Sequence, residues 1–107
     1  LQPLSGTKER KAALEAILNA ESPRDIINAL TSYRDAYGFP ENEQVLAKLL
    51  DVSDEEVLKQ TIEAIASLEK EGRLKRSNTF KARLKTVQMT VDDSDVQEAA
   101  KNLLERL

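Results

Sequence analysis

The sequence predicts an all-α protein in which three antiparallel helical hairpins stack as a right-handed solenoid fragment. Charged residues make up 33% of the chain, beside only two tyrosines, two phenylalanines and three glycines, which favours helices around an aliphatic core. Apolar residues recur at the i, i+3, i+4 spacing of one helical face along most of the chain. Helix-start signals at Ser22, Ser53 and Asp92 are 31 and 39 residues apart, a period typical of one helical hairpin per unit.

The 107 residues suffice for one domain, which we expect over residues 8–107. Residues 1–7 contain proline and glycine without periodicity, so we expect a flexible lead-in there. Apolar spacing predicts a first helix from Lys8 to Ala20. Ser22 is then the expected cap of a second helix, with proline at its first position, and Gly38 is expected to end that helix.

Residues 45–72 contain the clearest hairpin. Ser53 is placed to accept a hydrogen bond from the N–H of Glu56, whose carboxylate can reach back to the N–H of Ser53. This capping box predicts where the second helix of the hairpin begins. Gly72 is expected to end it, because glycine adopts the left-handed conformation of a helix terminus at little steric cost.

The first half of the third hairpin fits two different periodicities. Residues 80–91 fit a helix through every third or fourth residue, and their last five residues also alternate as a strand does. The second half repeats the start signal, with Asp92 as the expected cap and Asp95 three residues later. An apolar stripe from Val96 to Leu107 then predicts the last helix.

The segments LLDVSDEEV and QMTVDDSDV are similar to the D-x-x-x-V turn that precedes the second helix of HEAT or armadillo-like repeats. The resemblance covers residues 44–72 and 80–107. It implies a non-catalytic protein–protein interaction or scaffold module, because such stacks present extended binding surfaces. The partner that it implies is another protein.

An alternative is a winged-helix nucleic-acid-binding domain. LAKLLDVS, a long helix and LEKEGRLKR are similar to the helix-turn-helix core of that family, and the wing would come from residues 73–91. Its recognition helix would be residues 54–71, which carry six acids and two lysines, a net charge of −4. Because phosphates would repel this helix, we expect a protein partner in preference to nucleic acid.

Charge is distributed unevenly along the chain. Residues 73–91 carry +6 and no acid, whereas residues 1–72 carry −6 and residues 92–107 carry −3. Such a segment suits an acidic protein, a phosphorylated partner or nucleic acid, but it can equally neutralise acidic helices beside it, the interpretation we favour. The candidate partner-binding residues are Arg73, Lys75, Arg76, Lys81, Arg83 and Lys85.

Several kinds of chemistry are not expected. The chain has no cysteine and no histidine, so it lacks thiolate metal sites, disulfides and the commonest general base. The acids Asp92, Asp93 and Asp95 lack the glycine and distant glutamate of a calcium loop, and helix capping accounts for them. We therefore expect no metal, no cofactor and no enzymatic activity. No apolar run is long enough for a membrane span, and a cytoplasmic protein is the default expectation.

Tyr33, Tyr37 and Phe39 cluster near the end of the second predicted helix. Aromatic side chains are favoured at binding hot spots, but at helical spacing they more often belong to a core. We favour core packing for these three.

Overall fold

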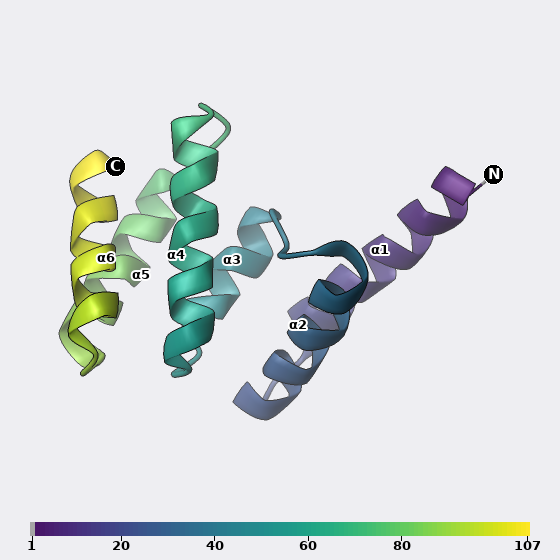
Figure 1. Cartoon of the computed structure of the whole chain (residues 1–107), viewed down its shortest axis with the longest axis horizontal. Coiled ribbons are helices and arrows are strands. Elements are labelled where there is room, and N and C mark those ends of the chain that lie inside the picture. The colour runs from purple at the N-terminus through teal and green to yellow at the C-terminus, as the bar shows by residue number, and fades with distance from the viewer. Residues whose placement is uncertain (1) are drawn as a thin grey trace. The chain divides into compact units, whose positions relative to one another are not determined.

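The computed structural model describes the backbone of residues 2–107 and the side chains of residues 8–107. Within that part of the chain all regular structure is helical, as the apolar periodicity predicted, and there is no strand. The six helices, coloured along the chain in Figure 1, are α1 (Gln2–Asn19), α2 (Pro23–Tyr37), α3 (Glu43–Leu49), α4 (Glu55–Lys70), α5 (Ser77–Thr90) and α6 (Ser94–Arg106).

Contacts within the chain divide it into two compact units, residues 1–40 and residues 41–107, and each is described by itself. The single domain expected over residues 8–107 stays a prediction. Helix α1 begins at Gln2, ahead of the Lys8 start that apolar spacing indicated. The flexibility expected of residues 1–7 falls outside the residues whose side chains are described.

The first unit is a hairpin of α1 and α2. Ser22 caps α2 as predicted: its hydroxyl accepts a hydrogen bond from the Asp25 N–H at 3.1 Å, and proline occupies the first helical position. Gly38 ends α2 with a φ of 85°, a backbone conformation that residues other than glycine rarely adopt. The hairpin core consists of Ile17, Ile26, Leu30 and Tyr33.

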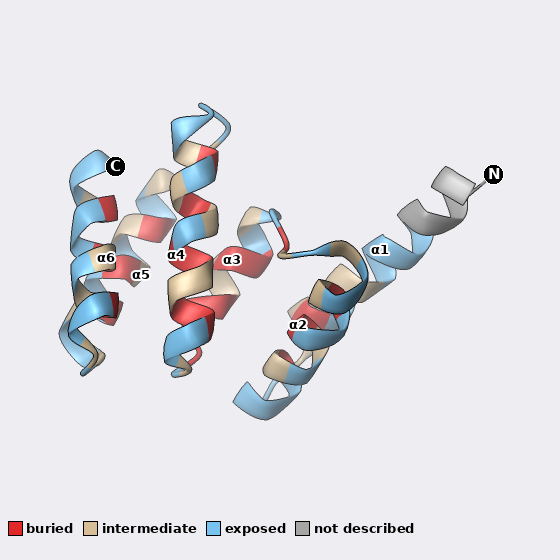
Figure 2. Ribbon diagram, in the orientation of Figure 1, coloured by how far each residue is buried: buried red, intermediate tan, exposed pale blue. Residues whose placement is uncertain are grey.

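The second unit contains two hairpins side by side, α3 with α4 and α5 with α6 (Figures 1 and 2). The second helices of the two hairpins, α4 and α6, pack against each other, and the first helices, α3 and α5, also meet. Figure 2 shows the buried residues on the inward sides of these helices. The largest fully buried side chains of this core are Leu46, Leu49, Leu58, Ile65, Phe80 and Leu84.

The cap of α4 differs from the predicted capping box. The capping residue is Asp54, whose carboxylate accepts the Val57 N–H at 3.0 Å, so the helix begins one residue later than Ser53 and Glu56 require. A carboxylate at this position is a stronger acceptor than a hydroxyl and also meets the positive end of the helix dipole. The prediction of a helix start at this turn is confirmed, and its assignment to Ser53 with Glu56 is wrong.

The cap of α6 also lies one residue later than predicted. It is Asp93, not Asp92, and one oxygen of its carboxylate accepts the Asp95 N–H at 2.9 Å. Its other oxygen lies 3.6 Å from the Lys59 ammonium of α4. Capping by Asp93 therefore combines helix initiation with a contact to the neighbouring hairpin, which explains the shift from the exposed Asp92.

Helix α4 ends at Gly72 as predicted. Gly72 has a φ of 72°, its N–H bonds to the Glu69 carbonyl at 3.0 Å, and the Arg73 N–H bonds to the Leu68 carbonyl at 2.9 Å. These two bonds make a Schellman motif, which satisfies carbonyls that the helix terminus would otherwise leave unpaired. The chain can then turn directly into the loop before α5.

The segment of ambiguous periodicity is helical. Helix α5 spans residues 77–90 and buries Phe80, Leu84 and Val87 along one side. The strand interpretation of residues 80–91 is therefore wrong, and residues 73–91 provide no two-stranded wing. The alternation of residues 87–91 was too short to decide between the two periods, whereas burial of Phe80 and Leu84 requires the helix.

The corrected cap of α4 can be tested by substitution. Replacement of Asp54 with alanine is expected to cost about 1 kcal/mol of unfolding free energy, because the Val57 N–H loses its acceptor. Urea unfolding followed by circular dichroism measures it. Ser53→Ala is the matched control and should change stability by less than about 0.5 kcal/mol. The reverse order of the two effects would restore Ser53 as the cap.

Candidate functional site

The basic segment forms the loop between α4 and α5 and the first turns of α5. Two of its arginines pair with acids of the same unit. Arg73 lies 3.0 Å from the Glu71 carboxylate and 3.7 Å from that of Glu41, and Arg83 of α5 pairs with Asp51 beyond the end of α3. For these two residues the structure agrees with neutralisation of neighbouring acids.

The loop backbone is also held by an acid. The Glu43 carboxylate, in the first turn of α3, accepts the Arg76 N–H at 2.8 Å and the Lys75 N–H at 3.1 Å. Helix α5 has no side-chain cap of its own at Arg76. Glu43 thus positions the start of α5 through hydrogen bonds to the backbone just before it, and leaves the side chains of Lys75 and Arg76 exposed.

The other four predicted binding residues, Lys75, Arg76, Lys81 and Lys85, form no ion pair with the acids that the structure describes. They do not share one face with Arg83. Lys81 and Lys85 are four residues apart and lie on the same side of α5, whereas Arg83 is about 200° around the helix from Lys81. The linear run of charge is therefore spread around α5.

The aromatic residues of the first unit behave as packing residues. Tyr33 is buried, and its ring centroid lies 5.1 Å from that of Tyr37 at an interplanar angle of 54°. The Arg10 guanidinium donates a hydrogen bond to the Tyr33 hydroxyl at 2.8 Å and lies 6.0 Å from the Tyr37 ring centroid. Core packing is thus confirmed for Tyr33, while Tyr37 and Phe39 are half-buried.

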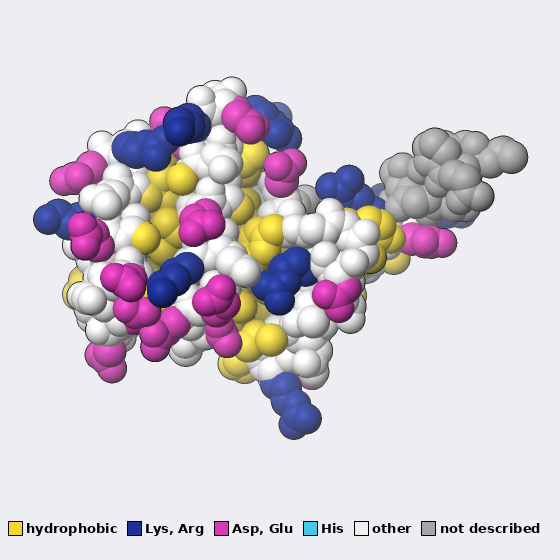
Figure 3. Space-filling view, in the orientation of Figure 1, with side chains coloured by type: hydrophobic (Ala, Val, Ile, Leu, Met, Phe, Trp, Pro, Cys, Tyr) yellow, Lys and Arg dark blue, Asp and Glu magenta, His cyan; other side chains and the backbone are white. Residues whose placement is uncertain are grey.

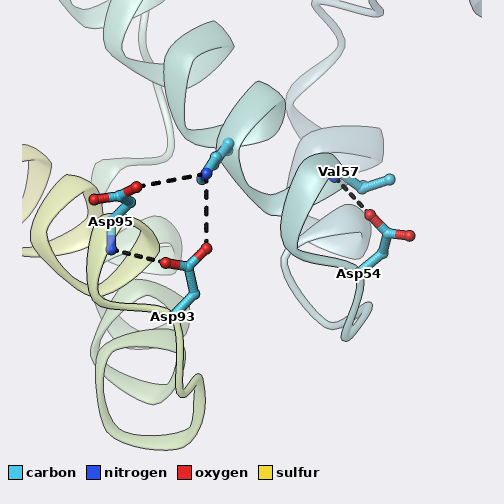
Figure 4. A network of polar contacts seen from close by, with 5 residues as sticks. Asp54, Val57, Asp93 and Asp95 are labelled. Carbon is cyan, nitrogen blue, oxygen red and sulfur yellow. Dashed lines mark hydrogen bonds and ion pairs between the residues drawn. The ribbon is translucent and has the colours of Figure 1, made fainter.

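The strongest concentration of acids lies where α4 and α6 begin. Lys59 of α4 is 3.6 Å from Asp93 and 3.9 Å from Asp95, so one ammonium bridges to the first turn of α6 (Figure 4). Asp54 caps α4 a short distance away, as the same view shows. Figure 3 shows acidic side chains gathered over this end of the two helices. We call it the acidic edge; its acids are Asp51, Asp54, Glu55, Glu56, Asp92, Asp93 and Asp95.

Two carboxyl groups of the acidic edge interact directly. The pKa of Glu55 is raised above its ordinary value of 4.5, first by a hydrogen bond with Asp93 and then by the negative charge of Asp93. The pKa of Asp93 is lowered from 3.8, first by the Asp95 N–H and then by the hydrogen bond with Glu55. Asp93 is therefore the group that holds the charge, and Glu55 is the group that holds a proton to higher pH.

A groove of about 340 Å³ lies beside the acidic edge, between the two hairpins of the second unit. One wall is the α3–α4 connection with the start of α4, and the other is the end of α5 with the residues after it. The lining residues are Leu50, Asp51, Val52, Ser53, Glu55, Leu58, Thr86, Val87, Thr90, Val91 and Asp92.

Sequence reasoning did not identify this groove. Its two walls are at least 28 residues apart in the chain, and neither has a motif that marks a binding site. The signal that could have found it is the pair of predicted caps at Ser53 and Asp92. If two hairpins lie side by side, the residues just before their second helices must meet at one edge.

Among the residues that the structure describes, no group of three or more acids is arranged to hold a metal ion. In the same part of the chain, no helix has both the length and the apolar character needed to cross a bilayer.

No protein-family model, curated protein or solved structure matches the chain.

The interaction of Glu55 with Asp93 predicts a change in titration. In Asp93→Asn the helix cap is retained, since asparagine caps as well as aspartate does, but the negative charge is lost. The pKa of Glu55 should then fall toward 4.5, as followed by NMR of its side-chain carboxyl carbon. Asp95→Asn is the control and should leave the pKa of Glu55 raised; an unchanged Glu55 in Asp93→Asn would contradict the assigned contact.

The same substitution should alter the pH dependence of stability. Because folding lowers the pKa of Asp93, its charge stabilises the fold above pH 3.8, and that contribution is lost as the pH falls through the folded pKa. Glu55 acts in the opposite sense, since a raised pKa favours the fold below 4.5 and the benefit is lost as the pH rises through the folded pKa. The stability difference between wild type and Asp93→Asn, measured by urea unfolding, should therefore first grow as Glu55 takes up its proton and then shrink as the pH falls through the folded pKa of Asp93.

Proposed function

We propose that this chain is a non-catalytic protein-interaction module built from helical hairpins of the HEAT or armadillo kind. The observation that carries the proposal is the packing of like helices in the second unit, α4 on α6 and α3 on α5. Proteins of that architecture use the surfaces between consecutive hairpins to bind other proteins. In the structure the caps of the second helices, Ser22, Asp54 and Asp93, are 32 and 39 residues apart, which supports one hairpin per repeat.

The chemistry of the chain also favours binding over catalysis. It has neither histidine nor cysteine, and the one buried polar side chain among residues 8–107, that of Thr61, donates its hydroxyl proton to the Val57 carbonyl at 2.7 Å. Enzyme sites usually keep buried or strongly perturbed ionisable groups poised for reaction. The interacting carboxyls of this chain, Glu55 and Asp93, instead lie at the surface, where they cap and border helices.

Nucleic-acid binding is the weaker proposal. Of the predicted binding residues, the four that form no ion pair with a described acid are spread over a loop and around α5, and two arginines are already paired. A duplex-binding surface needs several cations on one face, since each phosphate contact releases counterions and adds to affinity.

Duplex binding gives a direct test. We expect a dissociation constant weaker than about 10⁻⁴ M for a 20-base-pair duplex at physiological salt, measured by fluorescence anisotropy. A variant with Arg76, Lys81 and Lys85 changed to glutamate should lose at most this weak background binding. Tight binding with a steep salt slope that the variant abolishes would overturn the choice of a protein partner.

The proposed function itself is tested by copurification. The full chain is immobilised and incubated with nuclease-treated extract of its source cells, and retained proteins are produced separately for isothermal titration calorimetry. The proposal predicts at least one saturable complex with a dissociation constant of about 10 μM or tighter, a range of ordinary transient interfaces. It fails if no retained protein binds in the purified system.

A further inference from the structure

The groove between the two hairpins has an apolar floor. Leu50, Val52, Leu58 and Val87 are each at most 4% exposed, and together they form its base. A volume of about 340 Å³ is at the small end of ligand sites and suits one long side chain better than a folded element. An occupant would therefore place aliphatic carbon against this floor.

The walls offer hydrogen-bond acceptors with few free donors. The Thr90 hydroxyl donates to the Thr86 carbonyl at 2.8 Å, and the Thr86 hydroxyl donates to the Ala82 carbonyl at 3.3 Å. Both oxygens keep only acceptor capacity. The N–H groups of Asp51 and Val52 are likewise bonded to carbonyls of α3, at 3.1 and 3.2 Å. Apart from the Ser53 hydroxyl, an occupant must supply the donors.

The charge at the rim of the groove is negative, which suits an occupant that carries hydrogen-bond donors. The acidic edge contains seven acids, with Lys59 and Arg83 as the basic residues among them, a net charge of −5. The N-termini of α4 and α6 oppose a cation here, but each helix dipole is equivalent to only about half a positive charge. The carboxylates outweigh the dipoles. Glu55 and Asp92, both exposed, reach the groove from its opposite walls.

We propose that this groove binds an arginine side chain carried by an exposed segment of the partner protein. The aliphatic stem of arginine covers the leucine and valine floor, and the guanidinium directs its five donors at Glu55, Asp92 and Thr90. Arginine suits the site better than lysine because a planar, weakly hydrated guanidinium serves acceptors on two walls at once. The inference rests on the proposed interaction function and specifies the chemistry of the partner.

The test uses the full chain labelled with ¹⁵N and titrated with the peptide N-acetyl-Ala-Arg-Ala-amide. Amide signals of residues 50–58 and 86–95 should shift together and saturate with a dissociation constant of about 1 mM or tighter, as expected for a ligand of this size. The same peptide with citrulline in place of arginine has nearly the same shape without the charge. It should bind at least about fivefold more weakly.

Matched variants locate the site. Glu55→Gln and Asp92→Asn remove charge from exposed walls with little change of shape, and each should weaken the arginine peptide by about threefold or more. Glu63→Gln, on an exposed position of α4 outside the groove, is the control and should leave affinity unchanged. The spectrum of each variant without peptide verifies its fold.

Three results would overturn the inference: no shift with the arginine peptide, equal binding of the citrulline peptide, or shifts spread over acids throughout the chain. These results leave the proposed function standing if a copurified protein still binds the chain at another surface. Conversely, if the peptide binds at the groove but no protein partner binds in the purified system, the proposed function is wrong and the arginine site is supported.

Discussion

The packing of α4 against both α3 and α6 is the constraint on which the second unit depends. Helix α4 buries Val57, Leu58, Thr61, Ile62, Ile65 and Leu68, a stripe wide enough to be covered from two sides. Since α6 lies against α4, the beginnings of these helices come together at one edge. The groove, the acidic edge and the bridge from Lys59 to the first turn of α6 all follow from that arrangement.

Polar contacts between the hairpins accompany this apolar packing and add little stability of their own. Lys59 meets Asp93 at one end of the α4–α6 pair, and Arg106 meets Glu69 at the other. Exposed ion pairs of this kind typically contribute less than about 1 kcal/mol. The two ion pairs lie at opposite ends of the α4–α6 helix pair, so both can form in only one axial register of α6 along α4. They therefore contribute to the specificity of helix packing more than to its strength.

Charge in the folded chain is organised differently from charge in the sequence. The basic run is the most prominent feature of the sequence, yet folding distributes it around α5 and pairs Arg73 and Arg83 with nearby acids. Acids from two distant segments are instead collected at one edge beside a partly apolar groove. The sequence predicts a binding surface among the cations, whereas in the folded chain the carboxylates beside the groove suit a cationic partner.

Local sequence alone indicated every helix except α5, and several of the helix ends, because capping and apolar spacing are interactions among residues a few positions apart. Ser22, Gly38 and Gly72 were identified in this way. The choice of Asp54 over Ser53 follows from the stronger carboxylate acceptor. The choice of Asp93 over Asp92 needed tertiary structure, because the adjacent aspartates had comparable capping capacity and contact with Lys59 distinguished them. The state of residues 80–91 and the existence of the groove were likewise decided by packing between segments far apart in the chain, which no local pattern encodes.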